Sequence, residues 1–287
     1  MSDTQFAKVA VLGAGTMGAG IAQVCAQSGS QVVLQDITDE FVSKGLQRVS
    51  AFLQKGVDRG KVTEETRDQV LARIVTTTDR AEAAREADLV VEAVPEKLEL
   101  KNGLFRELAD VVSEACVLGS NTSSLSLAKV FDGVSNPGRC IGMHFFNPVP
   151  VMQLLEIVRA LQTSDVTYNA ACEVADRLNK TRVTVSDSPG FVVNRILLPM
   201  INEAVLSLAE GLATAEELDA AMRLGANHPM GPLALADLIG LDVCLYVMET
   251  LYEQFGDSKY RPAPLLRKMV DARYLGRKTG RGFFTYG

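Results

Sequence analysis

The chain has 287 residues, of which 47% are hydrophobic and 22% are charged, with a formal net charge of −6 at pH 7. This length allows one large hydrophobic core or two modest ones, and the composition is typical of a globular protein. The negative charge and the lack of a long basic run argue against nucleic acid as a partner, and no apolar run is long enough to cross a membrane.

The number and spacing of the cysteines bear on disulfide bonds, on metal binding and on the cellular compartment. They are odd in number, scattered, and without the Cys-x-x-Cys spacing that is typical of zinc sites or of redox-active pairs, so we expect neither a disulfide framework nor a metal site. The first strand is expected to begin so early that no room is left for a signal or transit peptide. We therefore expect a cytoplasmic protein. The five cysteines on which this expectation rests are Cys25, Cys116, Cys140, Cys172 and Cys244.

The first apolar run, residues 9–12, lacks polar alternation, as expected for a strand that is buried on both faces of a parallel sheet. A glycine-rich turn and an apolar helix follow it. Gly13 would permit the sharp turn, Gly15 would let the backbone approach a pyrophosphate, and Gly18 would let the helix pack closely on the strand. The helix N-terminus would supply N–H donors to the phosphates. The turn consists of Gly13, Ala14, Gly15, Thr16, Met17 and Gly18.

Asp36 ends the second apolar run, residues 32–35, where a carboxylate would accept hydrogen bonds from an adenosine ribose. A glycine-rich turn alone could belong to any α/β protein. Here the strand, the helix and the acid agree, which favours dinucleotide binding. A carboxylate would repel the additional phosphate of NADP, and no arginine follows Asp36 directly, so we expect NAD.

Residues 39–73 have the apolar spacing of helices and carry several cations. A turn around Gly56 and Gly60 splits them into two helices, the second with Thr63 as its N-cap. This pair is longer than a crossover needs, so we interpret it as an insertion with its own purpose.

Further strands alternate with helices, which predicts a Rossmann-type, doubly wound and mostly parallel sheet with an inserted helical pair. Polar clusters follow several of these strands, at the edge of such a sheet where ligands bind. The predicted strands cover residues 89–94, 116–118, 140–143, 154–158 and 183–185, and a helix covers 166–178.

The alternation of strands and helices stops after residue 186, so we predict two domains, residues 1–186 and 187–287. The second would be a small all-α domain with more apolar residues than it can bury alone, which favours a subunit interface and a homodimer. Its predicted helices are one opened by Ser188 and Pro189 and bent at Pro199, one with a Thr214–Glu217 capping box that ends at Gly225, and one over residues 237–252.

Only His144 and His228 have an ordinary pKa suited to proton transfer near neutrality. His144 follows a predicted strand at the ligand edge, and Glu156 lies within an apolar strand, where an unpaired charge is costly. A carboxylate paired with the imidazole would fix its tautomer and raise its basicity. The alternatives are a structural histidine and an outward-facing Glu156 on an edge strand.

Three further polar residues have structural interpretations beside functional ones. His228 lies between two prolines and a glycine in a turn, which favours a local structural role. Ser123 and Asn194 are neutral donors that could hold a substrate oxygen. They could equally be a helix N-cap and a helix-surface residue.

Taken together, the motifs resemble the L-3-hydroxyacyl-CoA dehydrogenase family, and they follow one another in the order of that family along the whole chain. They are the glycine turn, Glu92-Ala93-Val94-Pro95-Glu96, Ser120-Asn121-Thr122-Ser123-Ser124, His144-Phe145-Phe146-Asn147-Pro148, Pro189-Gly190-Phe191-Val192-Val193-Asn194-Arg195 and Lys278-Thr279-Gly280-Arg281-Gly282-Phe283.

This resemblance implies an NAD-dependent oxidoreductase that acts on a 3-hydroxyacyl-CoA. It places the catalytic dyad on His144 and Glu156 and implies substrate contacts for Ser123 and Asn194. CoA binding is implied for the helical pair, with Lys55 as the first and Lys61 as the second choice for its phosphates, although these lysines could also be a solvated face. The implied cofactor contacts are the glycine turn, Asp36, Ala93, Glu96, Lys101, Asn121 and Ser123.

Two rival functions remain open at this point. One is a dehydrogenase of a free hydroxy acid on the same scaffold, and the other is a non-catalytic structural homologue that keeps the fold. The last residues follow the family's final motif closely, so we expect no fused hydratase domain.

Overall fold

The computed structural model of the chain describes residues 6–287, which form two compact units, 6–188 and 189–287. The boundary predicted from the sequence lies two residues earlier. Among the described residues, no helix combines the length and the apolar character needed to cross a membrane.

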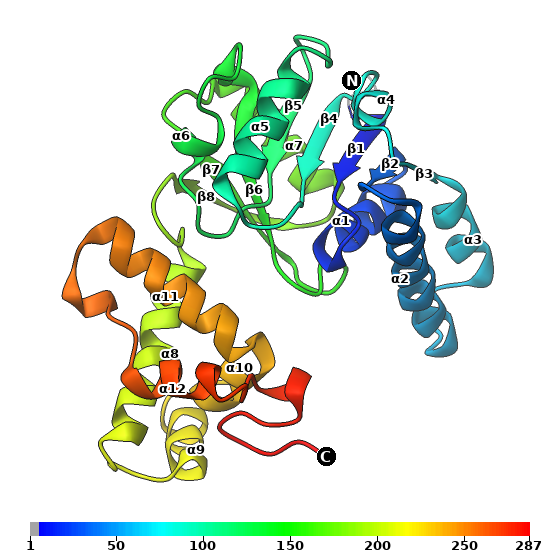
Figure 1. The fold of residues 1–287 in the computed structure, drawn as a ribbon. Helices are drawn as coiled ribbons and strands as arrows, with labels where there is room; N and C mark the ends of the chain where they lie inside the picture. The colour runs from blue at the N-terminus through cyan, green and yellow to red at the C-terminus, as the bar shows by residue number, and fades with distance from the viewer. Residues whose placement is uncertain (1–5) are drawn as a thin grey trace. The chain divides into compact units, whose positions relative to one another are not determined.

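The first unit is built on one eight-stranded sheet with the order β3-β2-β1-β4-β5-β6-β7-β8 (Figure 1). Neighbouring strands from β3 to β6 are parallel, in the order of a doubly wound fold, and β7 runs antiparallel to β6. The predicted fold class is confirmed. The strands are β1 Lys8–Leu12, β2 Gln31–Gln35, β3 Ile74–Thr77, β4 Leu89–Glu92, β5 Val117–Ser120, β6 Cys140–Phe145, β7 Leu154–Arg159 and β8 Thr181–Ser186.

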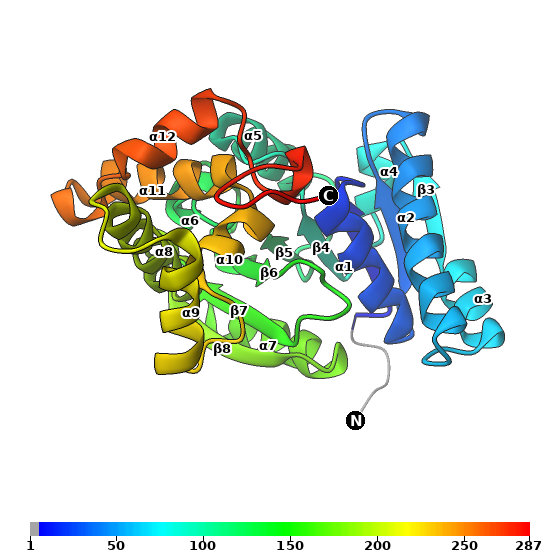
Figure 2. The ribbon, with the colours of Figure 1, turned by 90° about the horizontal axis from the view of Figure 1, so that it is seen from below.

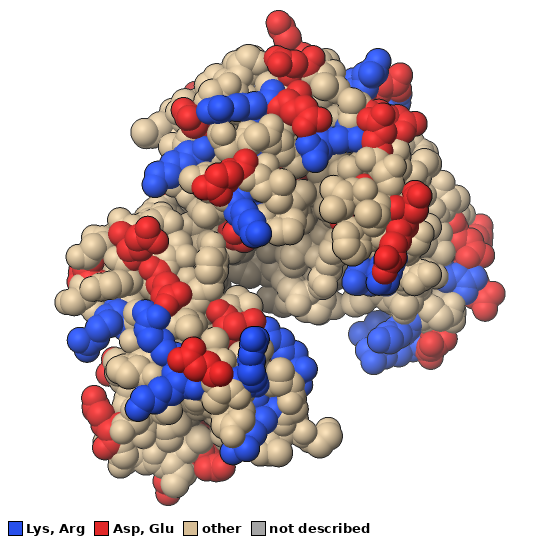
Figure 3. All heavy atoms as spheres, in the orientation of Figure 1, with Lys and Arg blue, Asp and Glu red and all other residues tan. Residues whose placement is uncertain are grey.

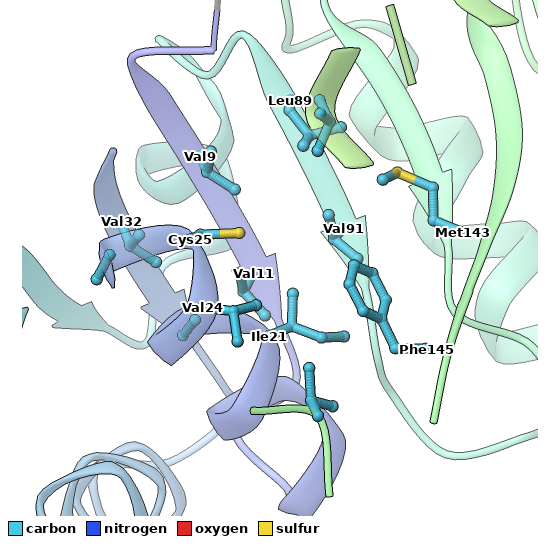
Figure 4. Packing of buried hydrophobic residues seen from close by; sticks show 14 of the residues in the cluster. Val9, Val11, Ile21, Val24, Cys25, Val32, Leu89, Val91, Met143 and Phe145 are labelled. Carbon is cyan, nitrogen blue, oxygen red and sulfur yellow. The ribbon is translucent and has the colours of Figure 1, made fainter. Parts of the chain in front are cut away.

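The core of the first unit explains why β1 lacks polar alternation. Val9 and Val11 pack against helix α1 on one face, whereas Ala10 and Leu12 point to the other face and are fully buried there. Figure 4 shows part of the cluster beneath α1, with Ile21, Val24 and Cys25 of that helix among the strands. The helices of this unit are α1 Thr16–Gln27, α2 Asp39–Asp58, α3 Glu64–Ala72, α4 Arg80–Ala84, α5 Leu98–Ala109, α6 Leu127–Val130 and α7 Asp165–Arg177.

The predicted helical pair is confirmed as α2 and α3, which lie at the β3 edge of the sheet (Figures 1 and 2). Thr38 and Thr63 cap the two helices by accepting hydrogen bonds from backbone N–H groups of their first turns. The short β3 and α4 that follow were not predicted, because a four-residue edge strand with partly exposed side chains carries little periodicity.

Several strand ends differ from the prediction. β4 stops at Glu92 rather than continuing to residue 94, and β6 extends beyond residue 143 to Phe145. The extension arises because β6 forms an antiparallel ladder with β7, which residues 140–143 alone do not indicate. His144 therefore lies within a strand rather than after it.

The second unit is all-helical, but two of its predicted helices are wrong in detail. The first begins at Val193 instead of Ser188, because Gly190 and Phe191 have positive φ angles that a helix does not allow. The third is interrupted at Gly240, whose φ of 104° separates two helices. The helices are α8 Val193–Ala209, α9 Ala215–Gly225, α10 Pro232–Ile239, α11 Leu241–Phe255 and α12 Pro264–Asp271.

Other features of this unit agree with the sequence. The capping box of Thr214 and Glu217 is present, α9 ends at Gly225, and Pro199 lies inside α8. The core consists of residues from α8, α10, α11 and α12, such as Val205, Leu233 and Met248.

Candidate active site

The glycine turn has the geometry that a dinucleotide requires. A Cβ on Gly18 would lie 1.7 Å from the carbonyl oxygen of Gly13, so only glycine lets α1 pack directly on the turn. Gly15 is the N-cap of α1 and gives it no side-chain cap, so the first N–H groups of the helix are not satisfied by a cap side chain. A Cβ on Gly15 would meet nothing within 4 Å, which leaves room for phosphate oxygens. The residues present therefore fit a dinucleotide.

Asp36 supports the turn from the end of β2. Its Oδ2 accepts the backbone N–H of Ala14 at 2.7 Å and its Oδ1 accepts that of Ile37 at 2.7 Å. A carboxylate oxygen can accept more than one hydrogen bond, so these contacts leave capacity for a ribose. Arg48 of α2 also reaches the turn, since its Nη1 donates to the carbonyl of Ala14 at 3.2 Å. No role of Arg48 in the turn was predictable from the sequence, because the contact joins residues that are 34 positions apart.

Glu96 connects the segment after β4 with the loop after β5. Its Oε1 accepts hydrogen bonds from Thr122 Oγ1 at 2.6 Å and from the backbone N–H of Ser123 at 2.9 Å. These bonds and the ammonium of Lys101 outweigh the effect of burial, so the pKa of Glu96 is lowered. Glu96 and Ser123, two of the predicted cofactor contacts, are therefore brought together.

Lys101 and Asn121 are bound by protein groups. Lys101 is only 1% exposed, and its Nζ lies 2.7 Å from Glu92 Oε1 and 2.9 Å from Glu96 Oε2. Burial lowers the pKa of Lys101, but the two carboxylates raise it further, and the net direction is upward. Asn121 Oδ1 accepts the backbone N–H of Phe145 at 2.9 Å and so links the ends of β5 and β6. Direct cofactor contacts of Ala93, Lys101 and Asn121 remain predictions.

Ser123 does not cap a helix. Helix α6 begins at Leu127 with Ser126 at its N-cap, so the N-cap alternative for Ser123 is wrong.

His144 and Glu156 form a buried pair. Nδ1 of His144 lies 2.6 Å from Oε2 of Glu156, and the residues are direct partners in the β6–β7 ladder. Glu156 is fully buried and His144 is 6% exposed. The alternative of an outward-facing Glu156 on an edge strand is wrong, because β7 lies between β6 and β8. The arrangement can hold a proton on the imidazole and balance the resulting charge.

Asn194 and His228 belong to the second unit. Asn194 is the second residue of α8, and its participation in the site with His144 stays a prediction. His228 lies in the connection between α9 and α10, where its backbone N–H donates to the carbonyl of Met222 at 3.2 Å.

The cations proposed for CoA differ in their surroundings. Lys55 lies in the last turn of α2 and Lys61 follows that helix, and both are exposed. Among residues 6–287, neither forms an ion pair, whereas Lys44 pairs with Glu40. Basic side chains gather with acidic ones over the end of α2 in Figure 3. Across all of residues 6–287, the structure contains no group of three or more His, Cys, Asp and Glu side chains that could hold a metal ion.

Comparisons with known proteins agree with this geometry. Residues 8–188 match the family model for the NAD binding domain of 3-hydroxyacyl-CoA dehydrogenase, and residues 190–286 match its C-terminal domain. The chain is 51% identical over 279 residues, 97% of its length, to the whole of a probable 3-hydroxybutyryl-CoA dehydrogenase from Deinococcus radiodurans.

Two further relatives extend the comparison. The chain is similar to the crystal structure of (S)-3-hydroxybutyryl-CoA dehydrogenase from Ralstonia eutropha, with 51% identity and a TM-score of 0.94 over 98% of this chain and 99% of that one. It is 39% identical over 97% of its length to 90% of the human mitochondrial hydroxyacyl-coenzyme A dehydrogenase. The resemblance seen in the motifs is confirmed: the chain belongs to the 3-hydroxyacyl-CoA dehydrogenase family, and residues 8–188 are its NAD-binding domain.

Proposed function

We propose that this chain interconverts (S)-3-hydroxybutyryl-CoA and acetoacetyl-CoA with NAD as the hydride carrier, as its relatives' names describe for them. The observation that carries the proposal is the buried pair of His144 and Glu156. A catalytically inactive homologue would have no need to keep a buried ion-pairing group aligned with a histidine, because such pairs contribute little net stability.

The residues of the first unit would hold the cofactor in a defined way. The glycine turn would bind the pyrophosphate, and Asp36 would bind the adenosine ribose. Glu96 and its neighbours would contact the nicotinamide end of the cofactor. NAD, when bound, supplies the acceptor or donor of the hydride.

His144 acts as the acid and base. Because its Nδ1 is engaged by Glu156, proton exchange with the substrate oxygen falls to Nε2. In the oxidative direction His144 takes the 3-hydroxyl proton, and Glu156 stabilises the imidazolium that forms. In the reductive direction the same imidazolium returns the proton. Ser123 and Asn194 orient the reacting oxygen and the thioester carbonyl, and Lys55, with Lys61 as second choice, binds CoA phosphates.

An assay of NADH oxidation tests this proposal. We expect turnover with acetoacetyl-CoA, no comparable turnover with free acetoacetate, and competitive inhibition by free CoA. If kcat/KM for acetoacetate equals that for acetoacetyl-CoA and free CoA does not inhibit, the result would favour a dehydrogenase of a free hydroxy acid. The absence of turnover with both compounds, together with intact NADH binding, would favour a non-catalytic homologue.

The second unit is proposed to form a homodimer. Several of its apolar side chains are exposed in the single chain, such as Ile196 (67%), Leu212 (73%) and Leu224 (85%). Light scattering after size exclusion should give twice the mass of 30.9 kDa, and a monomer at micromolar concentration would refute the dimer. A cytoplasmic location is proposed as well, since all five cysteines are free and buried.

A further inference from the structure

Five residues at and after the ends of β4 and β5 form a closed ring of hydrogen bonds and ion pairs, which includes one backbone N–H group. Glu92 accepts from Ser120 Oγ at 2.6 Å, and that hydroxyl accepts the backbone N–H of Thr122 at 3.3 Å. Thr122 Oγ1 donates to Glu96 at 2.6 Å, and Lys101 Nζ closes the ring between Glu96 at 2.9 Å and Glu92 at 2.7 Å. The ring joins two neighbouring strands, since Glu92 and Ser120 are partners in their ladder.

The carboxylate of Glu92 is shielded from solvent, so water does not stabilise its charge. It is fully buried, and burial raises its pKa against the opposing effects of Lys101, Ser120 and the backbone N–H of Val94. A buried carboxylate is retained at such a cost only when partners compensate it. In this ring both of its oxygens are used, Oε1 by Lys101 and Val94 and Oε2 by Ser120.

The ring controls the position of two residues in the candidate site. Lys101 lies between two carboxylates, so its ammonium is held in place for Glu96 by its bond to Glu92. Glu96 in turn accepts the backbone N–H of Ser123 at 2.9 Å. Removing Glu92 would leave Lys101 with a single carboxylate partner. It would also remove the acceptor of the Ser120 hydroxyl, which holds the start of the loop after β5.

We propose that Glu92 is a positioning residue: it fixes Lys101, and through it Glu96 and Ser123, in the arrangement that receives the cofactor and the substrate. This inference rests on the proposed function for the roles of Glu96 and Ser123. The sequence places Glu92 inside the predicted strand 89–94 and in one of the motifs that carry the resemblance, but it assigns this residue no role of its own.

The test uses Glu92→Gln, which keeps the volume of the side chain and removes its charge. Glutamine removes the negative charge opposite Lys101, and it has only one oxygen to accept the bonds that Lys101 and Ser120 now donate to two separate oxygens. We expect the Kd of NADH, measured by fluorescence titration, to rise about tenfold or more, which is the typical effect of losing a hydrogen bond to a charged group. We also expect kcat/KM for acetoacetyl-CoA to fall by at least the same factor.

A double-mutant cycle with Glu96→Gln separates positioning from a merely structural role. If Glu92 acts through Glu96, then Glu92→Gln should change NADH affinity by less than about twofold in the Glu96→Gln background. An undiminished effect in that background, or NADH affinity within twofold of wild type for Glu92→Gln alone, would overturn the proposal.

Asp219→Asn is the matched control. Asp219 is also a buried carboxylate, and it accepts the backbone N–H groups of Leu233 and Ala234 in the second unit. Its variant should lower the melting temperature while leaving the Kd of NADH unchanged.

A second variant covers the case in which Glu92→Gln does not fold. Ser120→Ala removes only the hydroxyl that donates to Glu92, and it should raise the Kd of NADH about threefold. An unchanged Kd in this variant would count against the ring. Since NADH titration does not need acetoacetyl-CoA, a wild-type protein without turnover would refute the proposed function and still leave the ring testable.

Discussion

Nδ1 of His144 lies 2.6 Å from Oε2 of Glu156, and their Cα atoms are paired directly across β6 and β7. Direct partners in an antiparallel ladder project their side chains to the same face of the sheet, so the backbone register itself brings the two groups together. A slip of one residue in β7 would turn Glu156 to the opposite face. The dyad is therefore fixed by strand pairing before any ligand binds.

His144→Ala should lower kcat by about 10² to 10⁴, the usual contribution of a general acid and base, with little change in NADH affinity. Steady-state kinetics and fluorescence titration measure the two quantities. His228→Ala is the matched control, since His228 is the only other histidine and lies in a turn of the second unit. Turnover of His144→Ala within tenfold of wild type would remove His144 from the mechanism.

The sequence was sufficient for features that depend on local patterns. The glycine turn, the caps of α3 and α9, and the acid at the end of β2 each consist of residue types whose spacing has one dominant physical meaning. Pairing of Glu156 with His144 was also predictable, because a charge within an apolar strand needs a partner and only one candidate was near.

Features that depend on tertiary register were not predictable. The antiparallel β6–β7 ladder, which extends β6 to Phe145, has no local signature. The ring around Glu92 joins residues that are up to 28 positions apart. The helix predicted over residues 237–252 crosses the break between α10 and α11, because the positive φ at Gly240 leaves the apolar spacing unchanged there.

Asp36→Asn should change cofactor selection more than cofactor binding. The amide oxygen can still accept the N–H of Ala14, so the turn is supported, while the charge that would repel a 2′-phosphate is lost. We expect wild type to prefer NADH, and the ratio of kcat/KM for NADH over NADPH to fall at least about tenfold in the variant. Arg48, which already contacts Ala14, lies close enough to the turn to help bind the 2′-phosphate of NADPH in the variant. A wild-type preference for NADPH would contradict the assignment of Asp36.

Lys55→Ala should raise the KM for acetoacetyl-CoA about threefold to tenfold without a change in kcat, because an exposed cation that binds a phosphate contributes mainly uniform binding. Lys44→Ala is the control, since Lys44 is another exposed lysine of α2 that pairs with Glu40 instead. Equal effects of both substitutions would indicate a general effect of surface charge rather than a specific phosphate contact.

The cysteines should be unreactive in the folded protein. Burial raises the pKa of Cys25, Cys116, Cys140 and Cys244 to about 12, and Cys172 is buried too. Since the thiolate is the reactive form, only on the order of one molecule in 10⁴ at each of these four positions is ionised at pH 8. Ellman's reagent should therefore label no thiol within minutes in the native state and all five in guanidinium chloride. Rapid labelling of the native protein would show that the core opens readily.

Asp237 anchors the end of the chain to α10. It is 1% exposed, and its carboxylate accepts the backbone N–H groups of Phe283 at 3.0 Å and Phe284 at 2.9 Å and the hydroxyl of Tyr286 at 3.0 Å. In Asp237→Asn, one acceptor is replaced by an amide donor that faces these donors. We expect a loss of about 2 kcal/mol in the free energy of unfolding, measured by urea titration, and faster proteolysis after residue 276.

Asp242→Asn provides the comparison for that experiment. Asp242 binds Lys278 at 2.5 and 2.7 Å, but both side chains are at least 40% exposed. An exposed ion pair of this kind contributes less than about 1 kcal/mol. If the two variants unfold with equal free energies, the three hydrogen bonds to Asp237 do not stabilise the C-terminal segment. A larger loss for Asp237→Asn would instead show that the buried carboxylate on α10 stabilises the second unit by holding residues 283–286.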